Sequence, residues 1–125
     1  MSIHVRACDN VRVVELHGDI AIGRQLSRPL DLQGHPMDDL RETIRGLLEQ
    51  GHCRIVMDLR ELRFIDSAGL GELVACRKRT LERGGDIVLV HPRKKVQELL
   101  VMTLLSEVFR TFEDETEAVA SFAPR

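Results

Sequence analysis

The chain has 125 residues, of which 43% are apolar and 30% charged, and its formal net charge is −2. This length fits a single domain, residues 1–125, that can bury a core without disulfides. The composition is that of a globular protein, and no apolar run is long enough to insert into a membrane. The slightly negative net charge lacks the excess of positive charge that is typical of proteins that bind nucleic acid directly. No apolar signal core follows Met1, so we expect a cytoplasmic protein.

The cysteines give no sign of a disulfide framework or a metal site. Cys8, Cys53 and Cys76 are odd in number and widely spaced, and the five histidines are scattered. We therefore expect reduced, mostly buried thiols and no metal. The chain has no Trp or Tyr and four Phe, which argues against a base-stacking surface for single-stranded nucleic acid.

The first 36 residues divide into a hairpin and an irregular segment. Apolar residues alternate over residues 3–7, a β-rich run covers 11–16, and Asp9-Asn10 between them is a turn signal. This pattern predicts a β-hairpin. Residues 19–36 contain two glycines and two prolines, which predict a loop with a short helical turn near residues 24–27.

From residue 37 onward, predicted helices and strands alternate. The first is a helix at 37–48 that Gly51 ends, followed by a strand at 54–59 and an extended piece at 62–65. Next come a helix over 70–81 that Gly84-Gly85 stops, and a strand at 87–90. The last are a helix at 93–104, a strand at 108–112 and a final helix that Asp114 or Thr116 caps. The apolar stripe of the second helix includes Leu70, Leu73, Val74 and Leu81, and that of the third includes Leu104. Arg93, Lys94 and Lys95 in the first turn of the third helix indicate a solvated basic face.

This order predicts an α/β fold with a mixed, mostly parallel sheet of about four to five strands, an N-terminal β-hairpin and about four helices packed against the sheet. In such folds, functional sites collect at the carboxyl ends of strands. Ser67 lies at one of these ends, where the next helix begins.

The segment from Arg63 to Gly71 (RFIDSAGLG) is the most informative part of the chain. Gly69 and Gly71 fall inside the expected first turns of a helix, where each glycine costs about 0.8–1 kcal/mol relative to alanine. Two such glycines after an exposed serine indicate that another molecule approaches the backbone closely. The segment is therefore expected to present Ser67 to a partner.

Enzymatic readings of this segment are weak. The five residues Ile65 to Gly69 lack the first glycine of the G-x-S-x-G nucleophile elbow, and His91 is the single histidine after Ser67. Gly69 and Gly71 are not followed by the third glycine of a dinucleotide-binding loop, because position 74 is Val74, and no Gly-Lys-Ser/Thr occurs. We expect neither a catalytic residue nor a cofactor.

Two readings of Ser67 remain. It could simply cap the helix, as serine often does, but capping does not explain the two glycines. Alternatively, Ser67 is phosphorylated, which would add about −1.5 to −2 charge at a helix amino end. The helix dipole would tolerate that charge, whereas a docked partner would meet a bulky dianion.

These residues resemble the STAS domain, in the branch of bacterial anti-sigma factor antagonists. The likeness covers nearly the whole chain and is carried by the strand Ile55–Leu59, the motif Phe64–Gly71 and the Gly-Gly turn before Ile87. Leu16–Ile20 is similar to the L-x-G-E/D-L/I element after the second strand of the family. Leu104 with Val108-Phe109 is similar to its late L-x-x-x-F element.

The resemblance implies partner switching. The unphosphorylated antagonist binds a serine kinase that is also an anti-sigma factor, phosphorylation of the serine releases it, and a metal-dependent serine phosphatase reverses the change. The residues that carry over to the partner-binding surface are Asp19, Ile20, Asp66, Ser67, Ala68, Gly69, Leu70 and Gly71. In this picture Asp66 orients the serine and caps the helix, Gly69 and Gly71 let the kinase approach, and Leu70 packs at the contact. A monomer or weak dimer is expected.

Two departures fall on the same surface. Ala21 stands where the family usually carries an aspartate, and residues 22–36 form a longer connection than is typical. They bear on the identity of the partner rather than on the fold. The alternative is a STAS subunit without a switch, in a transport or other signalling complex.

Overall fold

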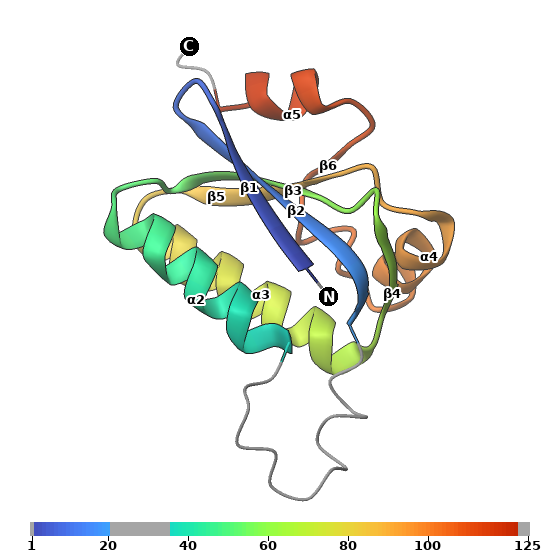
Figure 1. Cartoon of the computed structure of the whole chain (residues 1–125). Coiled ribbons are helices and arrows are strands. Elements are labelled where there is room, and N and C mark those ends of the chain that lie inside the picture. The colour runs from blue at the N-terminus through green and yellow to red at the C-terminus, as the bar shows by residue number, and fades with distance from the viewer. Residues whose placement is uncertain (1, 21–35, 123–125) are drawn as a thin grey trace, which may run out of the picture.

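The computed structural model describes residues 2–20 and 36–122 as a mixed sheet with helices on both faces (Figure 1). The strands are β1 (Ser2–Cys8), β2 (Val11–Ile20), β3 (Arg54–Asp58), β4 (Leu62–Ile65), β5 (Asp86–Val90) and β6 (Thr111–Phe112). The helices are α2 (Pro36–Glu49), α3 (Ser67–Glu82), α4 (Lys94–Met102) and α5 (Glu115–Ala120). None of the helices in these two ranges is long and apolar enough to cross a membrane. The short helical turn expected near residues 24–27 lies outside the described residues.

The strand order is β1-β2-β3-β5-β6, with β4 paired to the last residues of β2. Among the strands of the described residues, only β1 is antiparallel to its neighbour. The predicted α/β class, mixed sheet and N-terminal hairpin are therefore confirmed. The sheet has six strands because residues 62–65, expected only as an extended lead-in to a turn, pair in parallel with β2.

The hairpin forms where the sequence predicts it. Its register runs without interruption from Ser2 opposite His17 to Cys8 opposite Val11, which leaves Asp9-Asn10 as a two-residue turn. Asp9 has a φ of 55°, a left-handed conformation that aspartate tolerates better than most residues because its short side chain can bond locally.

The sheet separates two apolar cores. Ile55, Met57 and Leu89 face α2 and α3 and belong to the larger core, whereas Val56 and Val88 face α5 and belong to the smaller one. Successive side chains of a strand point to opposite faces, so β3 and β5 are apolar throughout because both of their faces are covered. Figure 1 shows α2 and α3 on one side of the sheet and α5 on the other.

The segment after α4 differs from the prediction. The helix ends at Met102, not at residue 104, and the Thr103 hydroxyl donates a hydrogen bond to the Leu99 carbonyl at its end. Leu104 has a φ of 62° and is 65% exposed. Phe109 is the residue that enters the core, and its N–H bonds to the Leu105 carbonyl. The leucine of the L-x-x-x-F element that packs against the core with Phe109 is thus the partly buried Leu105, and the strand expected over 108–112 shortens to β6.

Leu81 is a second departure, because it is 44% exposed rather than part of the buried stripe of α3. The buried positions of that helix near its end are Cys76 and Thr80, and residue 81 lies one position further around the helix. Burial raises the pKa of the Cys76 thiol to about 11, so this thiol stays protonated and unreactive at neutral pH. Cys8 and Cys53 are only partly buried.

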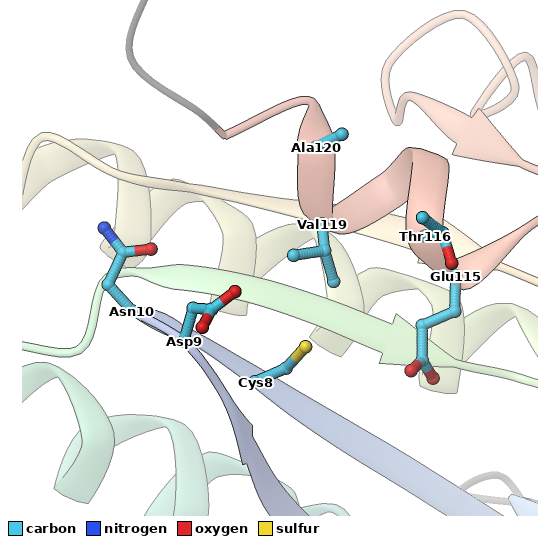
Figure 2. Close-up of a pocket in the computed structure, with 7 residues that line it drawn as sticks. All are labelled: Cys8, Asp9, Asn10, Glu115, Thr116, Val119 and Ala120. Carbon is cyan, nitrogen blue, oxygen red and sulfur yellow. The ribbon is translucent and has the colours of Figure 1, made fainter.

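An ion-pair cluster attaches α5 to the hairpin. Arg6 of β1 donates hydrogen bonds to Glu15 of β2, at 2.7 Å, and to Glu115 at the start of α5, at 2.9 Å. Bonding to Arg6 lowers the pKa of both glutamates from the ordinary 4.5. Beside it, an open cavity of about 470 Å³ lies between α5 and the hairpin turn (Figure 2), lined by Cys8, Asp9, Asn10, Glu115, Thr116, Val119 and Ala120.

We expect Arg6→Gln to lower the free energy of unfolding at pH 7 by about 0.5–1 kcal/mol, since the side chains involved are partly exposed. A glutamate with a lowered folded pKa stabilises the protein fully above pH 4.5 and loses that contribution as the pH falls through its folded pKa. The difference between variant and wild type should therefore shrink as the pH falls below that value. Urea unfolding between neutral and acidic pH measures it, and a difference that persists in acid would contradict the ion-pair explanation. Arg45→Gln, in an exposed pair within α2, is the control.

Candidate functional site

Two segments far apart in the sequence meet where β2 and β4 end. Ile20 pairs with Ile65, and the Asp66 N–H donates a hydrogen bond to the Ile20 carbonyl at 3.0 Å. The pairing contains an irregularity between Gly18 and Asp19, and Gly18 has a φ of 103°, a conformation that favours glycine. The pairing skips Arg63, so the extra residue lies in β4, and bulges of this kind are common next to functional sites. Beyond it, Asp19-Ile20 pairs with Phe64-Ile65, directly before Asp66-Ser67.

Asp66 is the residue that caps α3. Its backbone is extended, with φ −90° and ψ 175°, and its carboxylate accepts a hydrogen bond from the Gly69 N–H at 2.9 Å. This is the cap expected of aspartate at a helix amino end, and the Leu70 N–H adds a bond to the Asp66 carbonyl. Ser67 is the first residue of the helix and is exposed. The interpretation of Ser67 as the cap is wrong, because Asp66 provides it.

The two glycines of the motif have different structural reasons. Gly69 is buried, and a Cβ there would lie 2.7 Å from Ile65 Cγ1 and 2.9 Å from Ile20 Cγ2. Gly71 is exposed, and a Cβ there would meet nothing within 4 Å. Gly69 is therefore required by packing inside the molecule, which corrects its expected role in admitting a kinase. At Gly71 no internal contact accounts for the glycine.

Two other residues of the expected surface are also internal. Ile20 is fully buried and Leu70 is 2% exposed, and both belong to the larger core. Leu70 therefore does not present its side chain to a partner as expected, because that side chain fills the space under the sheet. The exposed residues of the set are Asp19, Ser67, Ala68 and Gly71, and Asp66 is partly buried.

The structure adds two residues to this surface. Phe64 is 46% exposed, and Arg63 forms an ion pair with Asp19 at 3.4 Å in which both side chains are more than half exposed. Side chains alternate between the two faces of a strand, so Arg63 is expected to point outward next to the buried Leu62. The same alternation places Phe64 on the face of Leu62 and predicts that Phe64 is buried. The exposure of Phe64 is decided by the irregular pairing with β2.

We expect Gly69→Ala to lower the free energy of unfolding by about 1–2 kcal/mol, because an added methyl group would push apart two branched, buried isoleucines. Gly71→Ala should instead raise it by about 0.5 kcal/mol, since alanine is the better helix former and the space is open. Denaturant unfolding of the two variants measures this contrast. Equal shifts for both alanines would refute the assignment of Gly69 to internal packing.

No group of three or more potential ligands (His, Cys, Asp or Glu) that could hold a metal ion occurs in residues 2–20 and 36–122. The cavity at the hairpin turn lies at the start of β2, whereas Ser67 lies beyond its end. The site at Ser67 is an exposed position at a helix amino end, with an acidic cap. Ala21 and most of the long connection at 22–36 lie outside the described residues.

Comparison with known proteins agrees with this arrangement. The profile of the STAS domain matches residues 2–118. The chain is 30% identical over 107 residues to the anti-sigma F factor antagonist of Paenibacillus polymyxa. The aligned region covers 85% of this chain and 89% of that protein.

Solved structures share the fold. An anti-sigma factor antagonist from Mycobacterium paratuberculosis superposes with a TM-score of 0.75 at 21% identity, over 96% of this chain and 92% of that one. The antagonist SpoIIAA in its unphosphorylated form superposes with a TM-score of 0.70 at 21% identity, over 96% and 95%. The phosphorylated form of SpoIIAA from Bacillus gives 0.67 at 17% identity, over 98% and 100%. The chain belongs to the STAS domain family.

Proposed function

We propose that this protein is an anti-sigma factor antagonist that acts by partner switching, with Ser67 as the phosphorylated residue. The observation that carries the proposal is the exposure of Ser67 at the first position of α3, directly after an aspartate that already caps the helix. The serine is thus not needed for capping, and it is presented where a kinase can reach it.

The position of Ser67 lets phosphorylation act on binding and not on folding. A phosphoryl group there would lie at the positive end of the dipole of a 16-residue helix, which favours negative charge. The same dianion would stand in the middle of a surface made of Asp19, Ala68 and Gly71. A partner docked there would have to bury an unpaired double charge beside the existing Asp19 and Asp66 carboxylates, and it would be released.

The named relatives support the proposal. The relative from Paenibacillus polymyxa is an anti-sigma F factor antagonist, and SpoIIAA, which shares the fold, has been solved in unphosphorylated and phosphorylated forms. By analogy the partners are an anti-sigma factor with serine kinase activity and a metal-dependent serine phosphatase, in the cytoplasm. In this proposal the protein is a binding protein and substrate rather than an enzyme, and it needs no cofactor.

The direct test is to isolate the protein from its native cells and to measure its intact mass and peptide spectra. A phosphoryl group on Ser67 whose occupancy changes with growth condition is the expected result. A serine that stays unmodified under every condition, in protein that co-purifies with a membrane transport system, would instead favour a STAS subunit without a switch.

A further inference from the structure

Strand β1 forms one edge of the sheet. In the part of the chain that the structure describes, β1 pairs with β2 only, so the backbone N–H and C=O groups on its other side have no neighbouring strand. A row of such groups is a template for pairing with a further strand. β1 is the first strand of the order β1-β2-β3-β5-β6, so it lies on the side of β2 away from β3, and Figure 1 draws it in dark blue.

This edge lacks the features by which proteins usually prevent such pairing. It is seven residues long, it contains neither proline nor lysine, and its register with β2 has no bulge. The opposite edge is different, because β6 has only two residues. Short length therefore protects one edge of the sheet, whereas no strand of residues 2–20 and 36–122 pairs with the outer side of β1.

The one permanent charge on β1 is neutralised within the same chain. Arg6 bonds to Glu15 and to Glu115 on the face that α5 covers, so it does not act as an uncompensated charge on the edge. On the other face, Ile3 packs partly against the larger core, Ala7 is exposed and Val5 is 44% exposed. An open backbone edge is thus combined with a short apolar row.

We propose that β1 pairs antiparallel with β1 of a second copy of this chain, about a two-fold axis at Val5. A two-fold axis makes the contact isologous, so the same patch is used by both copies. Val5 then lies opposite Val5 of the second copy, Ile3 lies opposite its Ala7, and His4 lies opposite its Arg6. The apolar row of each strand meets that of the other, and two sheets join into one.

This contact is independent of the site at Ser67. β1 occupies one edge of β2, whereas β3 and β4 pair with the other edge, and Ser67 follows β4. A dimer formed through β1 leaves both copies of Ser67 on the far side of β2, so one dimer would offer two partner sites. Ser67→Asp should accordingly leave the dimer unchanged.

Sedimentation equilibrium of the full chain from about 1 µM to about 1 mM tests the proposal. We expect reversible dimers in the wild type and at least about a tenfold larger dissociation constant in Val5→Lys, because two like charges would face each other across the axis. Leu81→Lys, at a residue with the same 44% exposure on α3, should dimerise as the wild type does. Mixing Val5→Lys with Val5→Glu chains should restore dimers as heterodimers.

A wild type that stays monomeric over this range of concentrations would overturn the proposal. Dimers whose dissociation constant Val5→Lys does not raise, or that Leu81→Lys weakens as much as Val5→Lys does, would also overturn it. If Val5→Lys does not fold, hydrogen exchange of the wild type decides. Amides of Ser2–Cys8 that gain protection as the protein concentration rises support pairing through β1, and exchange there that is independent of concentration refutes it.

Discussion

Gly85→Ala should lower the free energy of unfolding by about 3 kcal/mol, the upper range for added atoms in a packed site. A Cβ on Gly85 would lie 1.8 Å from the carbonyl oxygen of Cys53. The same oxygen accepts a hydrogen bond from the Asp86 N–H at 3.0 Å, where β3 and β5 begin to pair. The obstacle is backbone, so relief of the clash requires the two central strands to separate at this end. Urea or thermal unfolding measures the loss.

Gly46→Ala provides the matched control, because Gly46 lies in the interior of α2 and a Cβ there would meet nothing within 4 Å. Alanine should stabilise that helix by up to about 1 kcal/mol. The two substitutions add the same methyl group and are expected to have opposite signs. A Gly85→Ala protein as stable as the wild type would show that the ends of β3 and β5 do not lie as closely as described.

Ser67→Asp should weaken binding of the proposed serine kinase partner by about thirtyfold or more, whereas Ser67→Ala should bind that partner as the unphosphorylated protein does. The estimate follows from the cost of about 2 kcal/mol or more for burying an unpaired charge in an interface. Alanine removes the hydroxyl and so abolishes phosphorylation, but it introduces no charge. Calorimetry or surface plasmon resonance with the purified kinase measures both affinities.

Because Asp66 and not Ser67 caps α3, both variants should unfold within about 0.5 kcal/mol of the wild type, as is usual for exposed positions. Equal affinity of the alanine and aspartate variants would count against a switch at Ser67. A large loss of stability in either variant would mean that the serine has a structural role, and the affinities would then report on folding.

Several features followed from the sequence because they depend on neighbouring residues. The hairpin was predictable because apolar residues alternate on both sides of the Asp9-Asn10 turn. The helix α3 was predictable because apolar residues at helical spacing follow Asp66. The apolar runs over 54–59 and 87–90 predicted the strands β3 and β5. The position of Ser67 at the end of a strand and the start of a helix was predictable for the same reason, since strand and helix signals meet there.

Other features were decided only by tertiary packing. Gly69 and Gly71 are equivalent in a local pattern, yet one lies against Ile20 and Ile65 and the other against open space. Leu104 and Leu105 are identical neighbours, and the path of the chain after α4 exposes the first and packs the second against the core. Sequence periodicity gives the type of an element, whereas contacts between elements distant in sequence decide which of its residues are buried. Which residues are exposed around Ser67 therefore depends on the pairing of β4 with β2, two segments that are distant in the sequence.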